Sequence, residues 1–91
     1  MKIIVEDGLK QEITNLNCKW LLDDCKSIIK EVGLKELDIR FTQKKGEFGE
    51  SSSKLVIRDL EGRIIVIKDY NFGDKTDSEI TFKYCDGILS K

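Results

Sequence analysis

The fold of this chain is decided by residues 18–32, which read CKWLLDDCKSIIKEV. Their apolar residues recur at helical spacing, which predicts an amphipathic helix with one buried face. The apolar stripe consists of Cys18, Leu21, Leu22, Cys25, Ile28, Ile29 and Val32. Asn17 is a favourable N-cap residue, and Gly33 stands where a left-handed C-terminal cap is expected.

Two short strands are predicted before this helix. Residues 2–6 are rich in β-branched side chains and are followed by the turn dipeptide Asp7-Gly8. Residues 10–14 alternate between two faces, as a strand does. We therefore expect the two segments to pair as a hairpin, through either a two-residue turn or a longer, bulged connection.

Four further strands are predicted after the helix. They comprise residues 37–42, 55–60, 63–68 and 79–85. The first and the last alternate between apolar and polar side chains, as half-buried strands do. The middle two flank Glu61-Gly62, which predicts a hairpin. Residues 64–67 are apolar at every position, so the second strand of that hairpin is expected to be central and covered on both faces.

Two polar segments are expected to be loops. Residues 43–53 contain lysines, glycines and serines with Phe48 as the single aromatic residue, which predicts a mobile loop with little to bury. Residues 69–78 form the second polar segment. Residues 88–89 are expected to return to the edge of the sheet.

The fold class predicted from this order, ββαββββ, is α+β, with a single helix packed on an antiparallel or mixed sheet. Residues 1–91 are expected to form one small domain. Over residues 1–42, the hairpin followed by a helix across the sheet resembles the β-grasp fold of ubiquitin-like proteins. Ubiquitin-like modifiers end in Gly-Gly, whereas this chain ends in Ile88-Leu89-Ser90-Lys91. The resemblance therefore implies a fold and not the modifier activity.

The charge, the hydropathy and the cysteine content indicate the cellular location and exclude some classes of partner. The chain has 16 basic and 17 acidic residues, for a net charge of −1, so no overall field attracts nucleic acid or an anionic membrane. No apolar stretch approaches the roughly 20 residues of a membrane span, and no signal peptide opens the sequence. Three cysteines are an odd number and too few for a secreted disulfide scaffold. We therefore expect a cytoplasmic protein with no membrane partner.

No catalytic residues, metal site or cofactor site are expected, so the chain is not predicted to be an enzyme. The chain has no histidine, which excludes Ser-His, Cys-His and His-metal chemistry. Cys18 and Cys25 lie seven residues apart on one helical face, which suits neither a disulfide nor a short zinc motif. Residues 69–74 lack the glycine that an EF-hand calcium loop requires at its sixth position.

Trp20 is the most informative candidate for a binding residue. In the predicted helix it lies about 140° from the centre of the apolar stripe, counted in steps of 100° per residue. It shares that outer face with Asp24 and Glu31. Tryptophan is enriched at interface hot spots. Three readings stay open: the loop at residues 43–53 covers the indole, the indole anchors a partner protein, or the helical phase differs.

An acidic segment is the second candidate. Residues 69–79 carry Asp69, Asp74, Asp77 and Glu79, which would face a basic surface of a partner protein. Together with the helix surface, they predict a protein-binding module. We expect a small stoichiometric inhibitor or antidote that acts by surface occlusion, such as a phage anti-defence protein or a toxin immunity protein.

Two alternatives remain open. In the first, the chain is a structural or subunit module that adds a strand to the sheet of a partner. In the second, residues 43–54 bind nucleic acid weakly. The second is disfavoured because Lys44-Lys45 is a small basic patch. In addition, the inner residues of Gly46-Glu47-Phe48-Gly49 are acidic and apolar, which does not suit a GxxG clamp on phosphate.

Overall fold

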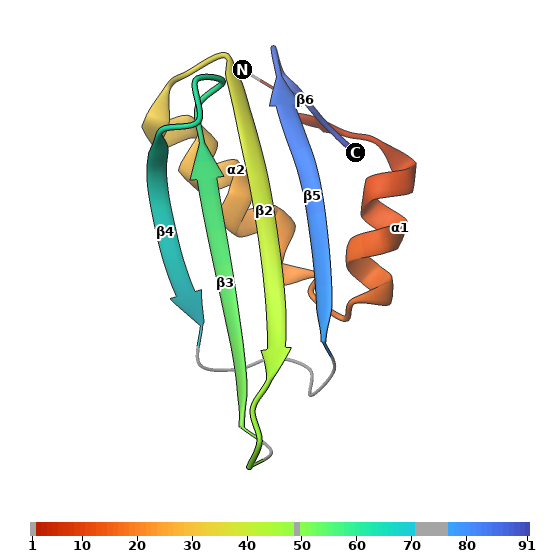
Figure 1. Ribbon diagram of the computed structural model, residues 1–91. Helices are drawn as coiled ribbons and strands as arrows, with labels where there is room; N and C mark the ends of the chain where they lie inside the picture. The colour runs from red at the N-terminus through yellow and green to blue at the C-terminus, as the bar shows by residue number, and fades with distance from the viewer. Residues whose placement is uncertain (1, 49, 71–76) are drawn as a thin grey trace.

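A computed structural model describes residues 2–48, 50–70 and 77–91 of the chain. The fold is α+β, with two helices packed against one side of a six-stranded mixed sheet (Figure 1). The elements are β1 (Ile4–Val5), α1 (Asp7–Asn15), α2 (Trp20–Val32), β2 (Glu36–Lys45), β3 (Ser51–Arg58), β4 (Ile64–Tyr70), β5 (Ser78–Cys85) and β6 (Ile88–Ser90). The strands follow the order β1-β6-β5-β2-β3-β4. The β1–β6 pair is parallel and the other pairs are antiparallel.

The predicted N-terminal hairpin is wrong, because Asp7–Asn15 forms helix α1. Leu9 and Ile13 lie four residues apart and are both fully buried, which is the spacing of a helical face. The carboxylate of Asp7 in the first turn interacts favourably with the positive end of the helix dipole. The predicted single helix and the order ββαββββ therefore become one strand, two helices and five strands. The basis for the β-grasp resemblance is lost with the hairpin.

Helix α2 is the predicted amphipathic helix, but it begins at Trp20 and not at Cys18. Its buried residues are Leu21, Cys25 and Ile29. Gly33 forms the predicted left-handed cap with φ 73°, and its N–H donates to the carbonyl of Ile29 at 3.1 Å. Asn17 does not serve as the N-cap. It has a φ of 60° and belongs to the connection between the two helices.

The centre of the sheet alternates as predicted. Strand β2 pairs with β3 on one side and with β5 on the other. The side chains of these strands that face the helices are Leu37, Ile39, Phe41, Leu55, Ile57, Ile80, Phe82 and Tyr84, all of them buried in the core. No described helix covers the opposite side of the sheet, which we call the open face (Figure 1).

The predicted loop at residues 43–53 is largely strand, because β2 and β3 both continue into it. Gln43 and Ser53 are buried and paired with each other in the antiparallel register. The side-chain amide of Gln43 donates to Ser53 Oγ at 3.4 Å and accepts from Ser78 Oγ at 3.0 Å. The polar composition therefore reflects a hydrogen-bonded end of the sheet, and residues 47–48 belong to a turn between the two strands.

Strand β4 is an edge strand, which corrects the prediction of a central one. It pairs with β3 alone among the described strands. Ile64 and Ile67 remain 53% and 54% exposed. The continuous apolar run at residues 64–67 therefore occurs in an edge strand, and two of its side chains remain exposed.

Two tight turns complete the sheet. The predicted hairpin at Glu61-Gly62 joins β3 to β4, and Gly62 has a φ of 85° that favours glycine. Asp86 and Gly87 have φ of 47° and 95°, as the two central residues of a type I′ turn require. Strand β6 consequently returns along β5, so residues 88–89 do return to the sheet. They do not form its edge as expected, because β6 lies between β5 and β1.

Candidate functional site

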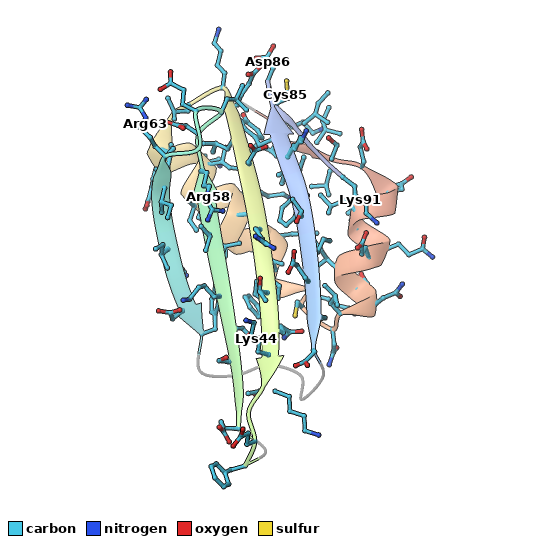
Figure 2. The ribbon with its side chains drawn as sticks, in the orientation of Figure 1. Lys44, Arg58, Arg63, Cys85, Asp86 and Lys91 are labelled. Carbon is cyan, nitrogen blue, oxygen red and sulfur yellow. The ribbon has the colours of Figure 1, made fainter. Side chains whose placement is uncertain are left out.

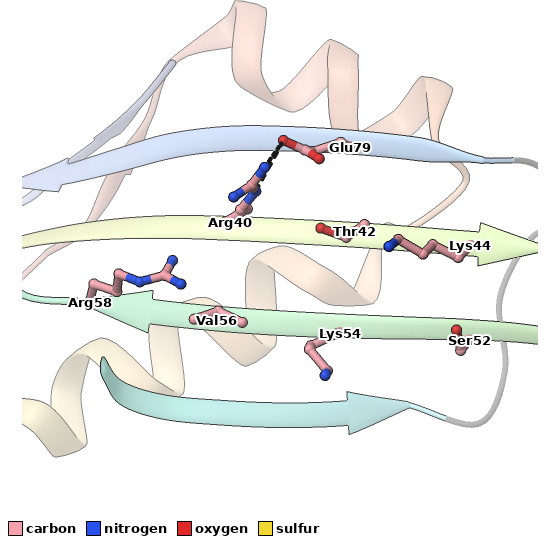
Figure 3. Close-up of a pocket in the computed structure, with 8 residues that line it drawn as sticks. All are labelled: Arg40, Thr42, Lys44, Ser52, Lys54, Val56, Arg58 and Glu79. Atoms are coloured by element: carbon pink, nitrogen blue, oxygen red, sulfur yellow. Dashed lines mark hydrogen bonds and ion pairs between the residues drawn. The ribbon is translucent and has the colours of Figure 1, made fainter. Parts of the chain in front are cut away.

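The most distinctive surface of the described chain is a shallow groove over the centre of the open face. It has a volume of about 360 Å³ and lies mainly on β2 and β3, with one residue from β5 (Figure 3). Its lining residues are Arg40, Thr42, Lys44, Ser52, Lys54, Val56, Arg58 and Glu79. We call it the basic groove. Figure 2 shows the labelled Lys44 and Arg58 at the two ends of this surface.

The period of the strands places these side chains together. Residues at alternate positions of a strand point to the same face. Arg40, Thr42 and Lys44 alternate along β2 with residues that point into the core. The same alternation on β3 brings Lys54 and Arg58 to the open face. Burial of the apolar residues beneath the helices therefore forces the cations onto one surface.

The groove carries a charge of +3, from four cations and one carboxylate, although the net charge of the chain is −1. Arg40 pairs with Glu79, and its Nη2 and Nε lie 2.7 Å and 3.0 Å from one carboxylate oxygen. Lys44, Lys54 and Arg58 form no ion pair with a described residue. The groove is thus a cationic surface in which only the charge of Arg40 is neutralised by another lining residue, Glu79.

This arrangement is suited to binding anionic groups. Ammonium and guanidinium groups donate charge-assisted hydrogen bonds to carboxylates and phosphates. The hydroxyls of Thr42 and Ser52 lie among them and are further donors. The only carboxylate in the lining, that of Glu79, is engaged by Arg40.

The structure places Trp20 differently from its predicted outer helix face. The indole is partly buried against the core. Its ring lies 5.8 Å from that of Phe41, nearly edge-on, and 4.5 Å from that of Tyr70. The predicted phase of α2 holds, since its buried residues are Leu21, Cys25 and Ile29. The indole is covered in part because Phe41 and Tyr70 of the sheet contact it. A role for Trp20 in anchoring a partner remains a prediction.

Asp24 is tied to the same end of β4. It accepts hydrogen bonds from Tyr70 Oη at 2.8 Å and from Lys68 Nζ at 3.0 Å. Burial would by itself raise the pKa of Asp24, but these two hydrogen bonds and the charge of Lys68 outweigh it and lower the pKa below its ordinary value. Burial and the neighbouring Asp24 raise the pKa of Tyr70. The cluster therefore fixes α2 to β4 through an ionised carboxylate.

Asp24→Asn is expected to lower the free energy of unfolding by about 1–2 kcal/mol at pH 7, because a neutral acceptor replaces a charged one. The folded-state pKa lies below the unfolded value of about 4, so this stabilisation is complete above that pH and is lost as the pH falls through the folded-state pKa. Urea titrations at neutral and acidic pH should show the difference between the two proteins shrinking in acid. A difference that is independent of pH would contradict the assignment.

The other predicted acidic residues lie on different elements of the fold. Glu31 is exposed on α2, Asp69 is exposed on β4, and Glu79 lies in the basic groove. The carboxylate of Asp77 accepts from the backbone N–H of Lys45 at 2.7 Å. Asp74 lies outside the described residues. The expectation that residues 69–79 form one acidic binding surface stays a prediction.

The cysteines form no disulfide and lie apart. Cys18 and Cys25 are buried, whereas Cys85 is exposed. Burial raises the pKa of the Cys25 thiol to about 12, with a smaller contribution from Asp24, so this thiol is protonated at neutral pH. Within residues 2–48, 50–70 and 77–91, no histidine, cysteine and carboxylate side chains cluster as metal ligands.

The basic groove was missed in the sequence because its cations belong to different segments. Lys44 belongs to the small basic patch Lys44-Lys45, and Lys54 lies at the end of the same polar segment. Arg40 and Arg58 lie in predicted strands, where alternation already placed them opposite the apolar residues. Basic residues at alternate positions of two neighbouring strands were therefore the available signal.

Comparisons of the chain with models of protein families, with curated proteins and with solved structures gave no match. Neither α1 nor α2 combines the length and the apolar content that crossing a membrane requires, as judged over the described residues. The class defined by the fold and the site is an α+β domain with a cationic groove on an open sheet face. The functional argument rests on that groove.

Proposed function

We propose that this chain is a non-enzymatic protein-binding module and that its basic groove holds an acidic segment of a partner protein. The observation that carries the proposal is the set of cations on the open face. Lys44, Lys54 and Arg58 lack an ion-pair partner among the described residues. An acidic segment would supply the missing carboxylates.

A binding role suits the groove better than catalysis. Its lining contains no histidine and no cysteine, and its single carboxylate, that of Glu79, is occupied by Arg40. A general base would have to leave this ion pair before it accepted a proton. Capture of an acidic surface would act by covering it, as a stoichiometric inhibitor or antidote does.

The proposal changes the expected charge of the partner. The sequence suggested a basic partner that meets residues 69–79, whereas the groove favours an acidic one. Exposed ion pairs are individually weak, so several cations must act together. Binding should therefore fall steeply with ionic strength.

A fluorescently labelled polyglutamate peptide provides a direct test by anisotropy. Lys54→Glu combined with Arg58→Glu is expected to weaken binding by about tenfold or more, because two attractive contacts become repulsive. Lys10→Glu combined with Lys19→Glu makes the same change in net charge away from the groove, where both residues are exposed. That control should change the affinity by less than about twofold, as expected for distant, exposed charges.

Two results would argue against this function. Equal losses in the two double variants would show that only net charge matters. Absence of binding by the unaltered protein at low salt would remove the acidic-partner proposal. Thermal unfolding of each variant must accompany the titrations, because a variant that has lost its fold says nothing about the groove.

A second candidate is strand addition at β4. This strand forms one edge of the described sheet, is seven residues long and exposes Ile64 and Ile67. Long edges with exposed aliphatic side chains are templates for pairing with another chain. Partner capture that survives high salt and both groove substitutions, but is lost in Ile67→Lys, would favour this candidate.

A further inference from the structure

The cations of the basic groove are evenly spaced along the sheet. In the register of β2 and β3, Arg58 lies opposite Asp38, and Lys54 lies opposite Thr42. Arg40 and Lys44 occupy the intervening and following positions on β2. We number each paired position of the two strands, or level, by its residue on β2. The four cations then lie at levels 38, 40, 42 and 44 and alternate between β3 and β2. Figure 3 shows this alternation from Arg58 to Lys44.

We call this arrangement the cation ladder. Each step covers two residues of an antiparallel strand, or about 6.8 Å at a rise of about 3.4 Å per residue. The three steps from Arg58 to Lys44 span about 20 Å. An extended peptide has the same period, because its side chains return to one face at every second residue.

We propose that the basic groove recognises an extended acidic segment with aspartate or glutamate at alternate positions, lying along β2 and β3. This inference rests on the proposed function and specifies the ligand of the same site. A segment of about seven residues would place one carboxylate at each of the four levels. At three of them the cation lacks a described ion-pair partner, whereas Arg40 already holds Glu79. Its intervening side chains would point away from the sheet.

The levels of the ladder are not equivalent. Lys54 lies across from Thr42, and Lys44 lies across from Ser52, so each of these lysines has a hydroxyl donor opposite it. At the other end, the cation of Arg58 faces the carboxylate of Asp38 in the register. A bound carboxylate should therefore be held best at the two lysine levels, and Lys54 is the most informative position to change.

A peptide fits the groove better than nucleic acid does. Proteins that bind single strands generally combine cations with aromatic side chains on which bases stack. The described open-face residues of β2, β3 and β5 include no aromatic side chain. At the level of Lys54, the strands that flank β2 and β3 each carry a carboxylate: Glu79 on β5 and Asp69 on β4. These carboxylates repel negative charge that lies to either side of the ladder.

The experiment compares two labelled peptides of identical composition. In one, glutamate and serine alternate; in the other, all glutamates precede all serines. The alternating peptide is expected to bind the unaltered protein about fivefold more tightly, since additional exposed ion pairs contribute modestly each. Lys54→Gln should remove most of this preference. Lys83→Gln changes another exposed lysine of the same face, on β5 outside the groove, and should preserve it.

The outcomes separate this inference from the proposed function. If both peptides bind equally and both weaken in Lys54→Gln, the groove binds acidic segments but the spacing has no role. If neither peptide binds, the inference and the proposed function both fail. Tighter binding of an oligothymidylate of matched charge than of the alternating peptide would also overturn the inference, because it would show that the groove prefers phosphate.

Discussion

Phe41→Ala is expected to lower the free energy of unfolding by about 3–5 kcal/mol, a large part of the stability of a domain of this size. Phe41 is fully buried on β2, at the centre of the sheet. Its ring contacts those of Trp20 and Tyr70, with centroids 5.8 Å and 6.3 Å away. Removing it leaves a cavity between α2 and the sheet that the two remaining rings can fill only in part.

Phe48 supplies a matched control for this substitution. It is 93% exposed in the turn that follows β2. Phe48→Ala should change the stability by less than about 0.5 kcal/mol, as surface substitutions usually do. Urea titrations followed by far-ultraviolet circular dichroism measure both variants. Similar losses in the two proteins, or a loss below about 1 kcal/mol in Phe41→Ala, would contradict the described core.

Trp20→Ala is expected to destabilise the protein by about 2–4 kcal/mol, somewhat less than a fully buried tryptophan because the indole is only partly covered. The loss arises from its contacts with Phe41 and Tyr70, which connect the start of α2 to two strands. Trp20→Phe retains an aromatic ring and should recover much of the stability. Circular dichroism is the suitable probe, since this is the only tryptophan of the chain.

The same variant tests the interface role inferred from the sequence. An indole that served mainly as an anchor for a partner could be removed with little effect on folding. A loss of stability below about 1 kcal/mol with an unchanged spectrum would show that the ring contributes little to the core. That result would favour the predicted role of Trp20 in partner binding on the helix.

Much of the fold follows from local patterns. The stripe of apolar residues in α2, the glycine cap at Gly33 and the alternation of β2 and β5 were all predicted correctly. Helix α1 was missed because a short segment fits two periods. Residues 10–14 alternate like a strand, yet Leu9 and Ile13 have helical spacing and are the buried residues. Over so few residues, only tertiary packing decides between them.

Local patterns suffice to predict which strand faces are apolar, where α2 ends and where the β3–β4 hairpin turns, because spacing and turn residues act locally. Tertiary structure alone decided that β4 lies at an edge and that Trp20 packs on the sheet, since both depend on strand order. The tertiary structure also creates the basic groove. Arg40 and Arg58 lie far apart in the chain, and only the antiparallel register of β2 and β3 brings their charges to one surface.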